Sequence, residues 1–289
     1  MSLEIVPCRD HQQLRDYIDQ YWRKDHVLAL DQRMFEFTYM TPWVDPEVFT
    51  GGVSVLCTYN DQGDLAGFLG SIVAPYPRPH SYWLALWHVL PETKGTGIGG
   101  QLLQAMQDVA YDDDGWIGTF GAGSEAVPVY LKRGYAVRGV RRWLFDGTAR
   151  PEPGRLPAAT EGEVLPPEDW LCYRYDQHPI WTYDRSGQTV TRTEENEWGV
   201  VTHVLLLGPE WPQVIPAVHR QAAELAGARP FMMDAWAFDC PGTGWTLAPD
   251  DAPSVFHPPE PRGNIIYASG RPYLPMAVGK GDCDQDRPN

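Results

Sequence analysis

Apolar positions recur at helical and strand spacings along the first half of the chain. Positions 14, 17, 18, 21 and 22 carry apolar or aromatic residues, and this spacing places them on one face of a helix. Asp10 precedes them and can cap the helix, with Gln13 three residues on, an arrangement close to a capping box. The segments 53–58 and 65–74 predict two strands joined by a hairpin turn that contains glycine.

Strands and helices then alternate. The apolar segment 82–90 predicts a strand that ends at Pro91. The next helix has an apolar face formed by Ile98, Leu102, Met106 and Val109. A buried strand at 116–120, a short helix that ends at Gly134 and a last strand at about 135–145 complete the pattern. We expect an α/β fold, with helices packed on a mixed sheet.

A proline-rich segment divides the chain. Residues 147–167 hold five prolines and almost no large apolar residues, which is typical of a linker. We therefore predict a first domain at residues 1–146 and a second at 168–289. The second half predicts a smaller α/β half-domain, from a strand at 198–207, a helix that starts near Trp211 and a strand at 231–238.

Composition and charge narrow the class of protein. The 289 residues suffice for about two domains, and a hydrophobic content of 43% excludes a disordered chain. No apolar run approaches about 18 residues and the first residues lack a signal pattern, so we expect neither a membrane span nor secretion. The net charge of −15 argues against a nucleic-acid or anionic-membrane partner. The five cysteines form no CxxC pair, which favours reduced thiols in the cytoplasm.

A glycine-rich loop follows the strand at 82–90. Gly95, Gly97, Gly99 and Gly100 leave the backbone uncovered at a helix N-terminus, where amide groups can surround a phosphate. The spacing fits neither a dinucleotide-binding GxGxxG motif nor a Walker loop. The loop is either an anion site or a turn whose glycines only let the chain bend.

Two motifs resemble the GNAT acetyltransferase superfamily. Residues 94–99, KGTGIG, are similar to its acyl-CoA loop, Arg/Gln-x-x-Gly-x-Gly/Ala, with Lys94 in the first place. Residues 130–135, YLKRGY, resemble its Tyr-x-x-x-Gly-Phe/Tyr signature, although Gly123 stands where the family often has Asn. The resemblance implies a GNAT fold in the first half, a GNAT-like half-domain after it, and acetyl-CoA as acyl donor without a metal. It implies cofactor contacts at Val89, Leu90, Lys94, Gly95, Thr96, Gly97, Ile98, Gly99, Gly100 and Tyr130.

Acyl transfer to an amine needs a neutral nucleophile, a donor for the oxyanion and a proton for the thiolate. A backbone N–H near Val89 or Leu90 is the expected oxyanion donor. The phenol of Tyr130 is a suitable proton donor to the thiolate, and the alternative is that Tyr130 is a core tyrosine. His88, just before the loop, is a candidate base and alternatively a packed core residue. Glu36 and Asp45 are further candidates in the expected acceptor region.

Basic residues gather late in the first half. Their group within the acidic chain is either a solvated face or a positive rim for an anionic ligand. It comprises Lys132, Arg133, Arg138, Arg141 and Arg142.

A narrower resemblance concerns the acceptor. Residues 21–26, 174–179 and 282–289 are similar to segments of GNAT-like proteins from bacterial surface-polysaccharide clusters. This implies an amino-sugar acceptor, either free or nucleotide-linked. The expected acceptor contacts are Glu36, His178, Asp284, Asp286 and Arg287. The aspartates at 282, 284 and 286 have calcium-loop spacing but lack the required Gly and Glu, so no metal is expected.

Two alternatives stay open. In the first, the acceptor is an amino acid, a polyamine or a protein amine. The negative charge of the chain fits such a cationic acceptor. A non-catalytic acyl-CoA-binding protein is also compatible with the motifs, because no base is obvious. If the protein is an enzyme, the expected partner is a small-molecule amine. The sequence leaves the oligomeric state open.

Overall fold

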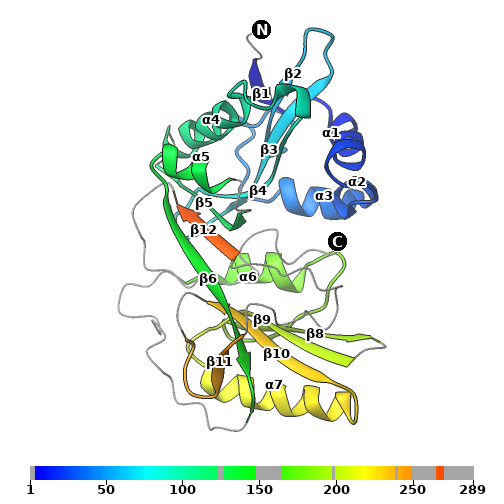
Figure 1. The fold of residues 1–289 in the computed structure, drawn as a ribbon, viewed down its shortest axis with the longest axis vertical. Coiled ribbons are helices and arrows are strands. Elements are labelled where there is room, and N and C mark those ends of the chain that lie inside the picture. The colour runs from blue at the N-terminus through cyan, green and yellow to red at the C-terminus, as the bar shows by residue number, and fades with distance from the viewer. Residues whose placement is uncertain are drawn as a thin grey trace.

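Two mixed sheets that share one long strand form the frame of the molecule (Figure 1). The computed structural model describes residues 4–112, 114–122, 126–147, 165–196, 199–237, 240–248 and 265–269. The shared strand is β6 (Ala136–Phe145). The predicted α/β class is confirmed, including the mixed sheet.

The first sheet has a strand from the end of the chain in its interior. Its strands β4 and β5 are parallel, whereas β12 is antiparallel to both of its neighbours, β5 and β6. Because β12 lies between them, residues from both ends of the sequence build this sheet. Its order is β1 (Ile5–Pro7), β2 (Val55–Tyr59), β3 (Leu65–Ala74), β4 (Ser81–Val89), β5 (Trp116–Ala122), β12 (Ile265–Ser269) and β6.

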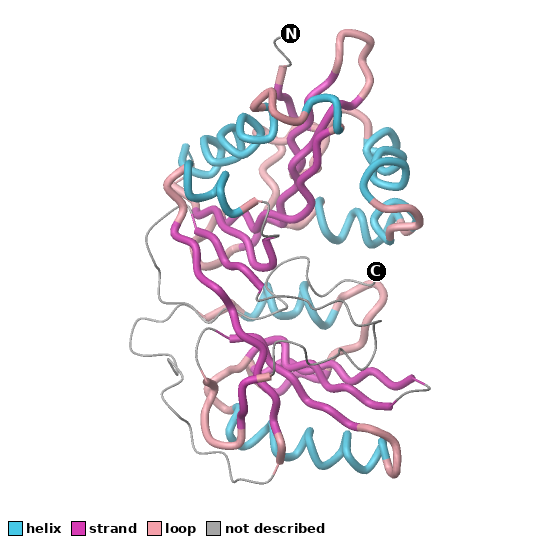
Figure 2. The backbone as a smooth tube through the Cα atoms, viewed as in Figure 1, coloured by secondary structure: helices cyan, strands magenta, loops and turns pink. Residues whose placement is uncertain are grey.

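Helices cover both faces of the first sheet, as Figure 2 shows. The two layers bury separate apolar clusters, and β3 is buried along its whole length because both of its faces are covered. One face carries α1 (His11–Tyr17), the π-helix η1 (Ile18–Trp22), α2 (Val27–Leu30) and α3 (Gln32–Tyr39). The other face carries α4 (Ile98–Asp112) and α5 (Val127–Lys132), and the short 3₁₀ turn η2 (Pro91–Thr93) precedes α4.

The second sheet continues from the far end of β6. The order is β6, β10 (Phe231–Ala237), β9 (Gly199–Leu206), β8 (Thr189–Asn196) and β7 (Asp184–Ser186), with β11 (Trp245–Leu247) also on β6. The amphipathic helix α7 (Trp211–Ala226) packs on one face. The other face meets α6 (Glu168–Leu171) and the π-helix η3 (Cys172–Asp176).

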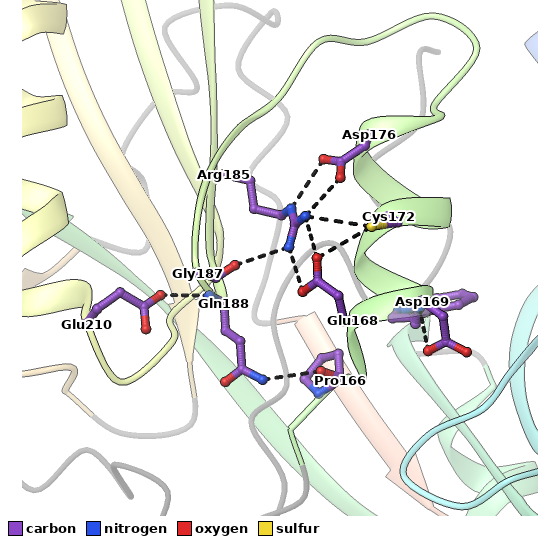
Figure 3. Close-up of polar contacts among 10 residues, drawn as sticks. Pro166, Glu168, Asp169, Cys172, Asp176, Arg185, Gly187, Gln188 and Glu210 are labelled. Atoms are coloured by element: carbon purple, nitrogen blue, oxygen red, sulfur yellow. Dashed lines mark hydrogen bonds and ion pairs between the residues drawn. The ribbon is translucent and has the colours of Figure 1, made fainter.

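The short helix α6 joins the two sheets. Trp170 packs among aromatic residues of the first sheet, whereas its neighbour Leu171 packs on the second sheet. The Arg185 guanidinium fixes this segment to β7 by ion pairs with Glu168 at 2.7 Å and Asp176 at 2.9 Å (Figure 3). These contacts hold the α6–η3 segment between the halves.

Local signals in the sequence predict several element boundaries. Asp10 caps α1 as expected, because its carboxylate accepts from the amides of residues 12 and 13. The capping box is incomplete, since the Gln13 side chain donates to the Gly63 carbonyl at 3.2 Å. Gly134 follows α5 with φ of +79°, in the expected left-handed conformation.

The predicted first helix changes its hydrogen-bonding pattern half-way. From Ile18 it continues as a π-helix, closed by a bond of 2.9 Å from the amide of Arg23 to the carbonyl of Ile18. A spacing rule based on 3.6 residues per turn cannot foresee such a turn. The π-turn changes where Tyr21 and Trp22 point.

The proposed division into domains stays a prediction. Residues 148–164, which include most of the predicted linker, lie outside the described residues. The observed feature is that β6 contributes to both sheets. In the part of the chain that the structure describes, no helix combines the length and apolar character needed to cross a bilayer.

Candidate functional site

The parallel strands β4 and β5 separate shortly after they meet. Pairing runs from Ser81 opposite Trp116 to Trp83 opposite Gly118 and ends there, whereas β12 pairs with the other edge of β5. At the fork, the Thr119 hydroxyl donates to the Leu84 carbonyl at 3.2 Å. Among the described residues, positions 84–89 of β4 therefore have no strand partner on this edge. We call this opening the splay.

A bulge occurs in the same part of β4. Between Trp87, opposite Leu69, and Leu84, opposite Ser71, β4 has one residue more than β3. Such a bulge bends the strand and increases its local twist. The bulge lies in the part of β4 that no longer pairs with β5.

Val89 directs an amide into the splay, and Leu90 does not. The Leu90 N–H donates to the Ala66 carbonyl at 2.9 Å, so it is already used. Antiparallel partners alternate between hydrogen-bonded and non-hydrogen-bonded pairs, so Val89, opposite Gly67, points its N–H away from β3. Of the two predicted oxyanion donors, only the Val89 amide faces the opening.

The glycine loop presents open amides at the start of α4. Gly95 and Gly97 have φ of +82° and +89°, a conformation that favours glycine. The amides of Lys94 and Thr96 donate within the loop, to the carbonyls of residues 91 and 93. Within the described residues, no backbone carbonyl accepts from the amides of Gly95, Gly97, Ile98, Gly99 and Gly100. Together with the positive end of a 15-residue helix, these groups can bind an anion.

Two side chains border these open amides. A Cβ atom on Gly99 would lie 3.3 Å from the Trp87 ring, and one on Gly100 would lie 3.3 Å from the Arg133 guanidinium. Gln104 also holds Arg133 there through a hydrogen bond. A cation beside a helix N-terminus is unfavourable unless an anion joins it. Nothing in the sequence distinguishes Arg133 from the other members of the basic group. What distinguishes Arg133 is its contact with Gly100, which the structure shows.

The corresponding turn of the second half is closed. At the start of α7 the Trp211 and Gln213 amides donate to backbone carbonyls at 3.1 and 3.0 Å, and the residue between them is proline. The Glu210 carboxylate accepts from the amides of Gln188 and Thr189 at 2.8 and 2.6 Å; the contact to Gln188 is drawn in Figure 3. Of these two described helix starts, the one of α4 is the one that offers a run of open amides.

Tyr130 lies on the α4–α5 side of β4. It is buried on α5, with ring centroids 5.9 Å from Trp87 and 5.2 Å from Tyr135. Trp87 belongs to β4 and also contacts Gly99 of the loop. Tyr130 is therefore packed as a core residue, and it also lies next to the splay.

His88 lies on the opposite side of β4, against α1 and η1. Its Nδ1 is 3.0 Å from the Tyr17 hydroxyl, and its ring centroid is 5.7 Å from that of Trp22. Burial, and next the charge of Lys94, lower the pKa of His88. The ring is accordingly neutral at pH 7 and can accept a proton. Burial likewise raises the pKa of Tyr17, which stays a phenol.

The predicted acceptor residues fall into two groups. Glu36 is exposed on α3. The ring centroid of His178 lies 4.9 Å from that of Phe37, which directly follows Glu36 in the chain. The His178 Nδ1 accepts from the amides of Ile180 and Trp181 at 3.2 and 2.9 Å, so it shapes a turn. The other three, Asp284, Asp286 and Arg287, lie outside the described residues.

The comparisons agree with the fold. Residues 13–135, which contain α4, the splay and Tyr130, match the acetyltransferase (GNAT) family. A GCN5-related N-acetyltransferase from Anabaena variabilis has 14% identity and a TM-score of 0.55 over 93% of this chain and 72% of its own. Another GCN5-related N-acetyltransferase, from Kribbella flavida, has 15% identity and a TM-score of 0.53 over 93% of this chain and 70% of its own. A putative acetyltransferase from Pyrococcus horikoshii has 11% identity and a TM-score of 0.52 over 99% of this chain and 96% of its own. These similarities show that the chain has the GNAT fold.

No protein with a curated description matches the chain by sequence. Among the residues that the structure describes, no group of three or more His, Cys, Asp or Glu side chains is placed to hold a metal ion.

Proposed function

We propose that this protein transfers an acyl group from acyl-CoA to an amine. The observation that carries the proposal is the set of open amides at the start of α4, directly beside the splay of β4 and β5. The amides and Arg133 suit a pyrophosphate, and Lys94 adds a cation in the same loop. The splay leaves the β4 backbone open to an acyl-pantetheine arm.

The residues around the splay would divide the chemistry among them. The thioester supplies the acyl group. The Val89 N–H would donate to its carbonyl oxygen as negative charge develops there. His88 would accept the proton of the attacking amine, and Tyr130 would donate a proton to the departing thiolate as the C–S bond breaks. Because His88 and Tyr130 lie on opposite sides of β4, the amine would approach from the α1–α3 side.

For the acceptor we propose an amino sugar. Support comes from the sequence segments similar to GNAT-like proteins of polysaccharide clusters. Amino acids, polyamines and protein amines are the competing acceptors. The cysteines at 8, 57, 172 and 240 are all free, which suits a reducing compartment such as the cytoplasm.

Two measurements test the proposal in sequence. Calorimetric titration of the purified full chain with acetyl-CoA should show binding, and titration with acetate should not. Release of CoA thiol is then followed with amino sugars, amino acids and polyamines, and the products are identified by mass spectrometry. Binding without acceptor-dependent thiol release would make the protein an acyl-CoA-binding module. The absence of any binding would refute the proposal altogether.

A further inference from the structure

Four rings form a continuous cluster on the α1–α3 side of β4. Tyr17 is central: its ring centroid lies 5.0 Å from that of Tyr21 and 5.6 Å from that of His88. Trp22 completes the group at 5.7 Å from His88. Two members are well exposed, Tyr21 at 46% and Trp22 at 40%, although the rest of the cluster is buried or half-buried. Exposed aromatic rings that continue a buried cluster can serve as a contact surface.

The π-turn of η1 produces this arrangement. Tyr21 and Trp22 end the turn, and single π-turns within helices occur frequently at functional sites. After Trp22 the chain is fixed by Asp19, whose carboxylate accepts from the Asp25 amide at 2.7 Å and pairs with Lys24. The two aromatic side chains therefore stand on a well-defined backbone.

Charges of both signs lie near the cluster. Glu92 contributes to raising the pKa of Tyr17, and Lys94 contributes to lowering that of His88, so charges of opposite sign act on neighbouring rings. Lys24 forms ion pairs with both Asp19 and Asp25. A ligand recognised here is selected by contact with flat ring faces rather than by its charge. This disfavours a polycation and favours a compact molecule with an extended apolar face.

We propose that Tyr21 and Trp22 form an acceptor subsite that selects amines carried on a ring, such as the pyranose ring of an amino sugar. The inference rests on the proposed acyl transfer and assigns the residues that select its acceptor. A ring stacked on Trp22 would hold its amine near His88, which contacts Trp22 directly and adjoins Val89 in β4. An open-chain amine would react without this contact.

The test compares two acceptors that share an amino-alcohol group. D-Glucosamine carries it on a ring, and 2-amino-1,3-propanediol carries it on an open chain. With saturating acetyl-CoA, Trp22→Ala and Tyr21→Ala should each lower the preference for glucosamine, expressed as the ratio of kcat/KM values, about tenfold or somewhat less. Trp22→Phe should retain most of it. Leu225→Ala, which removes an exposed apolar side chain from α7 in the second half, should leave the ratio unchanged.

The ratio separates the subsite from other effects. Trp22 also touches His88, so damage to proton transfer would lower both acceptors equally and leave the ratio intact. An unchanged ratio in both alanine variants overturns the subsite. So does a wild-type enzyme that binds acetyl-CoA but acetylates no ring amine. Failure to bind acetyl-CoA would instead remove the proposed function itself.

Discussion

A single phenol proton decides what His88 can do. The Tyr17 hydroxyl is within reach of two groups, the His88 Nδ1 at 3.0 Å and the Ala66 carbonyl at 3.4 Å. If the hydroxyl donates to Ala66, its oxygen accepts from His88 Nδ1–H and the lone pair of Nε2 remains available. If it donates to His88, the imidazole carries its proton on Nε2 and is no base. The first arrangement uses both contacts and suits the proposed role.

The pH profile of the reaction reports on His88. Burial and Lys94 both lower its pKa, so the neutral base should persist below the ordinary histidine value of about 6.5. We expect the acid limb of kcat/KM for the acceptor below that pH. Lys94→Gln removes a nearby positive charge and should move the limb upward, measured at saturating acetyl-CoA. Lys132→Gln, on α5, serves as a charge-matched control; a limb that stays in place in Lys94→Gln would contradict this account.

Tyr130→Phe separates chemistry from packing. The variant keeps the ring in its buried position and removes only the proposed proton donor. We expect kcat to fall about 100-fold or more, with acetyl-CoA affinity nearly unchanged. Stopped assays of thiol release and calorimetric titration measure the two quantities. A kcat equal to that of the wild type would make Tyr130 a core tyrosine only.

At the scale of elements, the loop before α4 was the most predictable part of the site. Its glycines, the strand before it and the helix after it are all local signals, and the structure places them as the sequence indicates. The π-turn of η1 and the partner of Arg133 could not be predicted. The first depends on a hydrogen-bonding pattern without a spacing signal, and the second on a contact between residues that are distant in the sequence.

Bulk and charge at Gly97 should abolish cofactor binding. Gly97→Glu places a carboxylate among the open amides and strains a backbone with φ of +89°. Acetyl-CoA titration should show no detectable binding. Gly63→Glu is the matched control, since Gly63 has φ of +85° in the β2–β3 turn, with no atom within 4 Å of an added Cβ. Equal affinity in a folded Gly97→Glu protein would exclude this loop as the anion site.

At the scale of the whole molecule, a buried ionic network ties the shared strand to the second sheet. Asp234 on β10 accepts from Arg142 of β6 at 2.8 Å and lies 2.7 Å from the Nδ1 of His203 on β9. Its side chain is only 3% exposed. In sequence, Arg142 belongs to the basic group considered as a rim for an anionic ligand. In the structure it pairs with Asp234 instead, because β6 continues beyond the first sheet.

Asp234→Asn should destabilise the protein strongly. It leaves Arg142 buried without its countercharge, and breaking such a pair costs about 3–5 kcal/mol. Thermal melting should therefore show a markedly lower Tm. Arg33→Ala removes an exposed partner of Asp31 and should leave Tm almost unchanged. A small shift in Asp234→Asn would mean that the network contributes little to joining the sheets.

The place of β12 has a consequence for how the chain acquires its structure during synthesis. This strand fills the gap between β5 and β6, yet it follows β5 by about half the chain. Until it leaves the ribosome, the facing edges of β5 and β6 are without this partner, and exposed strand edges invite association with other chains. Pairing across such a separation is also slow, because a long loop must close first. The first sheet, which holds the proposed reaction centre, is thus among the last parts of the nascent protein to be completed.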